Sequence, residues 1–192
     1  MRFLTLFAAT LLTVSACNTK KSGDAVQQTD STTQTQPATE TSADIEASAD
    51  LRRLVGEDTG LFRGVNLGDA IADVKAKEKI EQFETSSSHV GYTFEYPNLE
   101  STDILYFHDP AGKVNKIDVD LYLNDQASLT RYTRELTDYF NQRFGRQVPN
   151  GSETVWNAPA ARLVMKDVTK GKNFGLKFTF TGAATNLSAS AK

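Results

Sequence analysis

The feature that most constrains the fold is a series of short segments with large apolar residues at alternate positions. The segment NFGLKFTFT (173–181) places Phe174, Leu176, Phe178 and Phe180 on one side of an extended chain, because successive side chains of a β-strand point to opposite faces. Five further segments are interpreted as strands: residues 89–97, 102–109, 113–123, 153–157 and 160–168. The pattern predicts an antiparallel sheet of about six strands.

A strong helical pattern separates the two groups of strands. It is predicted to begin at a cap on Asn124 and to end at Gly145, since glycine commonly closes a helix. Its large apolar residues recur at steps of three and four, which is the spacing of one helix face: Leu129, Tyr132, Leu136, Phe140 and Phe144.

A looser helical pattern precedes the first group of strands. It covers residues 66–84, with Asp69 as a candidate N-cap. Its apolar stripe consists of Ile71, Val74, Ile80 and Phe83. The resulting order is helix, three strands, helix, three strands. This order predicts an α+β fold in which the helices pack on one face of the sheet.

The N-terminus has the composition of a secretory signal. A charged start is followed by a mostly apolar run, residues 3–14, which is too short to span a bilayer because a spanning helix needs roughly 20 residues. Ser15 and Ala16 then precede Cys17, the single cysteine of the chain. One cysteine forms no disulfide within the chain, so stability has to come from packing.

The order Val14-Ser15-Ala16-Cys17 resembles the bacterial lipobox. The resemblance implies that residues 1–16 are a cleaved signal peptide and that the chain is attached to a bilayer through acylated Cys17. Two or more acyl chains hold a protein stably to a membrane. Asn18 stands where aspartate marks many inner-membrane lipoproteins, which favours the outer membrane. The alternatives are an ordinary signal peptide with an incidental cysteine and a buried N-terminal helix.

Residues 17–50 are predicted to form a disordered tether. They are mostly Thr, Gln, Ser, Asp and Ala, a composition that cannot bury enough apolar surface to fold. A short helix is possible over 42–55. A single α+β domain is expected over 51–184, followed by a disordered tail, 185–192. From residue 51 onward there are 18 acidic and 18 basic residues, and this balance argues against nucleic acid as a partner.

Short motifs of the domain are similar to those of small envelope lipoprotein modules of the β-lactamase-inhibitor-protein-like type. They are FRGVNLGDAIADV (62–74), YFNQRFGRQVP (139–149) and the later Trp156. The resemblance implies protein binding or assembly and no catalysis, and it assigns no site residues.

Few residues are candidates for chemistry. His89 and His108 lack the spacing of a zinc motif, and no G-x-S-x-G or phosphate-binding loop occurs. We therefore expect no metal and no cofactor. Asp118 and Asp120 alternate along one strand and share a face, where they are either an acid–base pair or ion-pair partners of Lys116 and Lys177. The second interpretation fits an ordinary solvent-facing strand.

Trp156 is the candidate binding residue, because it lies in a short polar strand followed by Asn157 and Pro159; core packing is the alternative. Together these features predict a membrane-anchored envelope lipoprotein whose domain binds a protein or assists assembly without catalysis. A small-ligand carrier with an apolar pocket under the sheet is the other hypothesis, and a hydrolase using surface carboxylates is a third.

Overall fold

The computed structural model describes residues 48–183. The expected signal peptide, the acylated Cys17, the tether up to residue 47 and the C-terminal tail lie outside the described residues.

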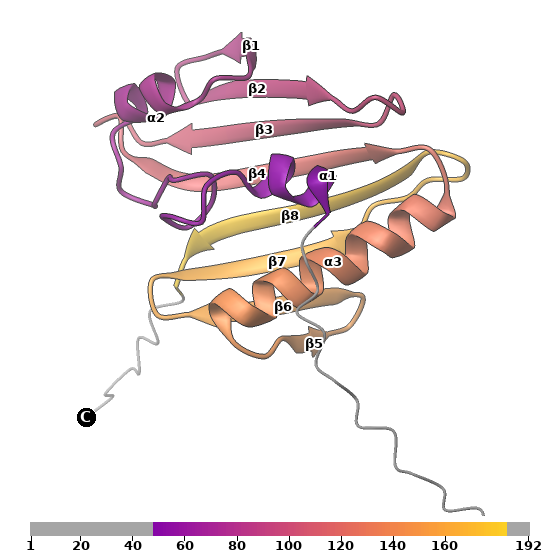
Figure 1. Cartoon of the computed structure of the whole chain (residues 1–192). Coiled ribbons are helices and arrows are strands. Elements are labelled where there is room, and N and C mark those ends of the chain that lie inside the picture. The colour runs from indigo at the N-terminus through magenta and orange to yellow at the C-terminus, as the bar shows by residue number, and fades with distance from the viewer. Residues whose placement is uncertain (1–47, 184–192) are drawn as a thin grey trace, which may run out of the picture. The chain divides into compact units, whose positions relative to one another are not determined.

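The described residues form three helices and eight strands (Figure 1). The first half contains α1 (Ala49–Val55), α2 (Ile71–Lys77), β1 (Glu81–Thr85), β2 (His89–Glu95), β3 (Ser101–His108) and β4 (Val114–Leu123). The second half contains α3 (Gln126–Phe144), β5 (Val148–Asn150), β6 (Glu153–Ala158), β7 (Ala161–Asp167) and β8 (Phe174–Gly182).

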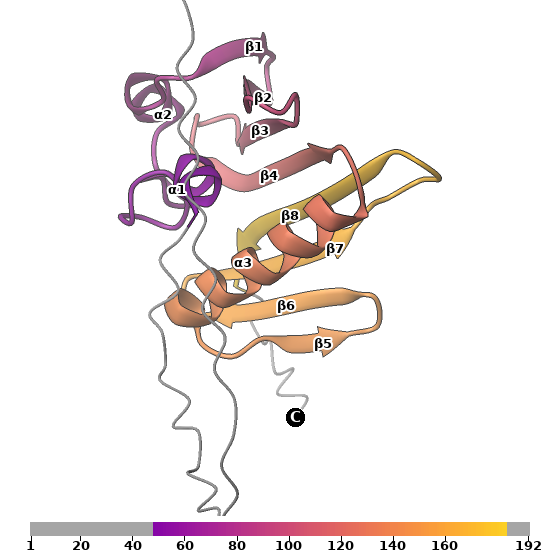
Figure 2. The ribbon, with the colours of Figure 1, turned by 45° about the vertical axis from the view of Figure 1, so that its right-hand side comes forward.

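All eight strands form one antiparallel sheet with the order β1-β2-β3-β4-β8-β7-β6-β5. Each half is therefore a four-stranded meander, and the last strands of the two meanders, β4 and β8, pair at the centre (Figure 2). The α+β class and the antiparallel sheet are confirmed. The expected count of six strands in two groups of three is wrong, because each group has four.

The two missed strands are β1 and β5. The pattern over 66–84 predicted one long helix, but α2 ends at Lys77 and residues 81–85 pair with β2. The physical reason is the side chain of Glu78, which is buried against Arg63 and Tyr106 just where the helix ends. Phe83, expected in the core stripe, is 46% exposed. Strand β5 has three residues, including Pro149, and is too short to show alternation.

Helix α3 matches its predicted pattern closely. The carboxylate of Asp125 accepts a hydrogen bond from the Ser128 amide (2.8 Å), so the N-cap lies one residue after the expected Asn124. Gly145 closes the helix with a φ of 82°, as predicted. Four members of the predicted stripe are buried: Leu129, Tyr132, Leu136 and Phe140.

Helix α1 belongs to the domain, which therefore starts a little before residue 51. The Ser48 hydroxyl caps it by accepting a hydrogen bond from the Leu51 amide (3.1 Å). Leu51, Leu54 and Val55 are buried in the same core cluster as residues of α2, α3 and the sheet. Part of the expected 42–55 helix, residues 42–47, lies outside the described residues.

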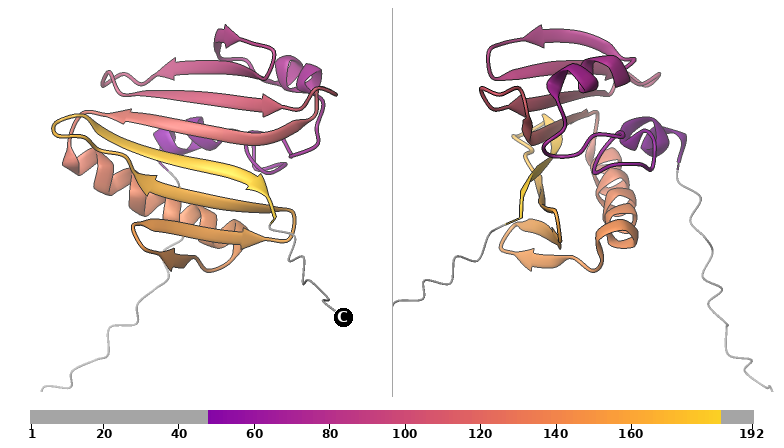
Figure 3. Two further views of the ribbon diagram at one scale, coloured as in Figure 1. Left: turned by 180° about the vertical axis from the view of Figure 1, so that it is seen from behind. Right: turned by 90° about the vertical axis from the view of Figure 1, so that its left-hand side faces the viewer.

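All three helices contribute to one core on a single face of the sheet, as Figure 3 shows in its right-hand view. The centre of this core is aromatic. The ring of Phe140 lies 5.4 Å from that of Trp156 and 5.5 Å from that of Phe178, with edge-to-face geometry in both pairs. Helix α3 is thereby fixed across the second half of the sheet.

Replacing Phe140 by alanine should lower the free energy of unfolding by about 3–5 kcal/mol, because it empties the centre of the aromatic cluster. Chemical denaturation followed by circular dichroism measures the change. Phe83→Ala is the matched control, since this ring is half-exposed, and it should cost less than about 1 kcal/mol. Equal losses in the two variants would contradict the packing described here.

Candidate functional site

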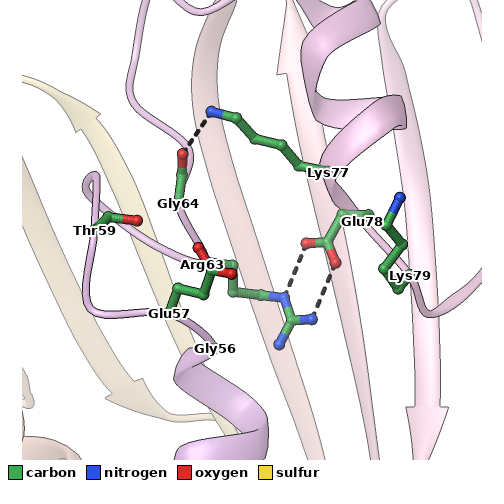
Figure 4. A pocket seen from close by; sticks show the side chains of 8 residues that line it. All are labelled: Gly56, Glu57, Thr59, Arg63, Gly64, Lys77, Glu78 and Lys79. Atoms are coloured by element: carbon green, nitrogen blue, oxygen red, sulfur yellow. Dashed lines mark hydrogen bonds and ion pairs between the residues drawn. The ribbon is translucent and has the colours of Figure 1, made fainter.

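A buried ion pair joins the two short helices to the sheet (Figure 4). Arg63 holds Glu78 through two parallel hydrogen bonds, Nε to Oε1 at 2.9 Å and Nη2 to Oε2 at 3.0 Å. The hydroxyl of Tyr106, on β3, donates to the same carboxylate. The Arg63 Nη1 group also donates to the carbonyls of Arg53 and Leu54, at the end of α1. This cluster is fully hydrogen-bonded and connects α1, α2 and β3.

A cavity of about 350 Å³ opens beside this cluster. Its lining includes Arg63, Glu78, Lys77, Lys79 and the 56–64 loop, and the Lys77 ammonium donates to the Gly64 carbonyl (2.8 Å). Burial lowers the pKa of Arg63, but the hydrogen bond and charge of Glu78 outweigh it and raise that pKa above its usual value. Arg63 and Glu78 neutralise each other, and the Lys77 and Lys79 ammonium groups donate to backbone carbonyls, which favours a structural role.

Trp156 lies in the core and not at a surface. It is fully buried, and its indole nitrogen donates to the Asn141 side-chain oxygen at 3.0 Å. Successive side chains of β6 point to opposite faces of the sheet, so Trp156 points toward α3 and Val155 points away from it. Its position supports the packing interpretation over the binding interpretation.

The two histidines make local contacts. His89 Nε2 lies 3.2 Å from the Glu84 carboxylate, and His108 Nδ1 lies 2.9 Å from the Asp109 carbonyl oxygen. Within residues 48–183, no three His, Cys, Asp or Glu side chains come together as a group able to hold a metal ion.

Asp118 and Asp120 lie on the same face of β4 and pair with lysines, as the second interpretation of these residues predicts. Lys116 lies 2.9 Å from Asp118, and Lys177 lies 2.7 Å from Asp120 and 3.6 Å from Asp118. The Thr179 hydroxyl also donates to Asp118 at 2.8 Å. Because every carboxylate here already has a cation, the geometry favours the ion-pair interpretation over an acid–base pair.

These aspartates belong to a large surface that the helices leave uncovered, which we call the open face. It consists of the sheet side chains that point away from α1 and α3, and the left-hand view of Figure 3 shows it from the front. Two large aromatic residues are exposed on it, Tyr122 at 53% and Phe83 at 46%. Phe107 is half-buried under the Lys116 ammonium, 3.7 Å from the ring centroid. Exposed aromatic side chains on an uncovered sheet are typical of a binding surface.

The two edges of the sheet are poorly suited to strand addition. Strand β1 is fully exposed but carries Glu81 and Glu84 and contains a register shift. Strand β5 has three residues, one of them Pro149. Charges, bulges, short strands and proline all discourage pairing at an edge. A partner is therefore expected on the face of the sheet and not at its edges.

Comparison with protein-family models, with curated proteins and with solved structures finds no match for this chain. Among residues 48–183, no helix is long and apolar enough to cross a membrane. The candidate site therefore rests on geometry and on the sequence. The sequence did not assign Phe83, Phe107 or Tyr122 to a site, although the outward residues of each strand are already visible in the alternation.

Replacing Arg63 by methionine should destabilise the domain by about 3–5 kcal/mol, because it leaves the Glu78 carboxylate buried without its cation. Denaturant unfolding measures the loss. The control is Lys77→Met, which removes an exposed ammonium of the same cavity and should cost less than about 1 kcal/mol. If both variants unfold at the same denaturant concentration as the unchanged protein, the cluster does not hold the helices.

Stability should fall as the pH rises above about 10, the usual tyrosine pKa. Burial raises the pKa of all six tyrosines, and the charge of Glu78 adds to this for Tyr106. Above the usual tyrosine pKa the folded chain therefore keeps protons that the unfolded chain loses. The contribution of the protonated tyrosines to stability is complete below about pH 10 and is lost as the pH rises through the raised pKa values. Denaturation midpoints measured from neutral to alkaline pH test this. Ionisation of the tyrosines near pH 10 in a still-folded chain would contradict it.

Proposed function

We propose that the chain is a membrane-anchored bacterial envelope lipoprotein whose domain binds another protein through the open face and catalyses no reaction. The observation that carries the proposal is an uncovered, eight-stranded face with exposed aromatic and apolar side chains. The resemblance of residues 14–17 to a lipobox supports the anchor. The similarity of residues 62–74 and 139–149 to envelope protein-binding modules supports a binding role.

The reach of the predicted tether suits this function. The described chain begins at Ser48, beside α1, on the helix-covered side of the sheet (Figure 3). About 30 residues separate Cys17 from Ser48, which can span about 100 Å when fully extended. A tether of this reach leaves room for a partner at the open face. Asn18 favours the outer membrane as the location.

The alternative hypothesis, a small-ligand carrier, needs an apolar cavity between α3 and the sheet. Aromatic rings occupy the centre of that region, namely Phe140, Trp156, Phe178 and Phe180. The described hollows lie at the surface and have mixed polar linings. Burial of these rings favours the protein-binding proposal over the carrier.

The test places a photoreactive phenylalanine analogue at Tyr122, on the open face, in full-length protein expressed in a bacterium and irradiated on intact membranes. Arg134 on α3, which is also exposed, is the matched control position. The proposal predicts a discrete cross-linked protein from Tyr122, none from Arg134, and release of the protein from the membrane fraction with Cys17→Ser. No product from Tyr122, or equal products from both positions, would contradict it.

A further inference from the structure

One row of charges crosses the centre of the open face. Four neighbouring strands contribute to it in the order β3, β4, β8 and β7. The directly paired residues are Asp103 with Asp120, Asp120 with Lys177, and Lys177 with Lys166. All four alternate with buried residues of the core, so their side chains share the outward face. Over these four strands the row therefore reads acid, acid, base, base, and Glu153 on β6 follows Lys166.

This order is unfavourable within one molecule. Like charges directly opposite each other on neighbouring strands destabilise a sheet, and this row contains two such pairs. The inner two residues neutralise each other, since Lys177 lies 2.7 Å from Asp120. The outer two, Asp103 and Lys166, have no ion pair within residues 48–183. Asp103 thus keeps a negative charge without an ion pair, and Lys166 keeps a positive one, although its neighbour on the next strand, β6, is Glu153.

A row with this order is complementary to itself. Consider a second copy related to the first by a two-fold axis that lies above the open face and runs parallel to β4 and β8. This rotation exchanges the acidic and basic halves of the row. The basic half of the second copy then lies over the acidic half of the first copy. Asp103 is placed opposite Lys166 of the second copy, and Asp120 opposite Lys177, so both like-charged pairs are neutralised.

The neighbouring rows of the face fit the same axis. In the next row the axis places Leu105 opposite Val164, which joins two apolar side chains. In the row beyond it, Phe107 comes opposite Arg162, a combination that supports a cation–π contact.

On the other side of the charged row, the half-exposed ring of Tyr122 comes opposite Gly175. A surface hollow of about 640 Å³ lies at that glycine, lined in part by Lys170 and Asn173. The Val168 side chain covers the place that a Cβ of Gly175 would take, at 3.1 Å, so the exposed ring meets an apolar side chain there. Partial burial, and then the charges of Asp103 and Asp120, raise the pKa of Tyr122, in keeping with the negative potential of this half.

We propose that the open face binds a second copy of this chain, face to face, about that two-fold axis. This inference rests on the proposed function and names the partner of the same surface. Two-fold pairing through one self-complementary patch is the commonest form of protein assembly. Eight strands about 4.8 Å apart and four outward rows cover roughly 34 by 20 Å, or roughly 700 Å². This is close to the roughly 800 Å² that each partner of a stable interface buries.

Charge reversal tests the proposal without unfolding the domain. Asp103→Lys places a lysine opposite Asp120 in its own sheet, so the isolated domain should become as stable as before or more stable. In the dimer, however, the introduced lysine of each copy lies opposite Lys166 of the other copy, so two repulsive pairs form. Lys166→Asp has the reciprocal effect in the dimer, where the new aspartate meets Asp103 of the other copy, although in its own sheet it lies between Lys177 and Glu153. The double variant, with both changes in one chain, restores opposite charges at both positions.

Sedimentation velocity of the purified full-length chain, over a concentration series at low and high salt, measures self-association. We expect dimers that weaken at high salt, at least about tenfold weaker association in each single variant, and recovery in the double variant. Thermal unfolding of Asp103→Lys should show no loss of stability. Arg134→Glu, an equivalent reversal on α3, should dimerise like the unchanged chain.

Three results would overturn the proposal. They are a chain that stays monomeric at every concentration, single variants that dimerise normally, and a double variant that does not recover. A cross-link from Tyr122 to a different protein, together with a monomeric purified chain, would also overturn it while leaving the proposed function intact. Absence of any product from Tyr122 counts against the proposed function itself.

Discussion

Pairing of β4 with β8 is the interaction on which the rest of the domain depends. Eight residue pairs join these strands, from Lys116 with Thr181 to Leu123 with Phe174. They connect two meanders that are far apart in the sequence, so the sheet exists as one unit only when this ladder forms. Ile117, Val119 and Leu121 on one strand, and Phe178 and Phe180 on the other, bury the central strip of the core.

The same ladder determines the open face. Since side chains alternate along a strand, the register that buries Val119 against Phe178 also places Asp120 beside Lys177. A shift of one residue would bring the apolar set to the solvent and the charged set under α3. Core packing and surface charge are therefore two consequences of one register. This explains how an ordinary hydrophobic core can position a specific row of charges.

Strong periodic patterns made much of the fold predictable. The alternation of residues 173–181 and the stripe of α3 each arise from the side of the element that is buried, and both elements lie where the patterns indicate. Prediction failed where local pattern and tertiary contact disagree. Residues 81–85 continue a helix-like composition, but burial of Glu78 against Arg63 ends α2 and leaves them free to pair with β2.

The site was harder to predict than the fold. Asp118 and Asp120 were correctly placed beside Lys116 and Lys177, because outward neighbours on adjacent strands follow from alternation alone. Trp156 is a candidate binding residue on sequence grounds because it lies in a short polar strand followed by Asn157 and Pro159, yet its orientation depends on the pairing of β6 with β7. The row from Asp103 to Lys166 depends on the non-local order β3-β4-β8-β7, which single segments do not encode.

The central claim is that the open face is covered in the anchored protein. Lysine labelling on intact membranes, read by mass spectrometry, tests it most directly. Lys166 on the open face should be protected, and should become reactive when the membranes are dissolved and the protein is diluted at high salt. Lys75, exposed on α2, should react equally in both conditions. Full reactivity of Lys166 on intact membranes would contradict the account.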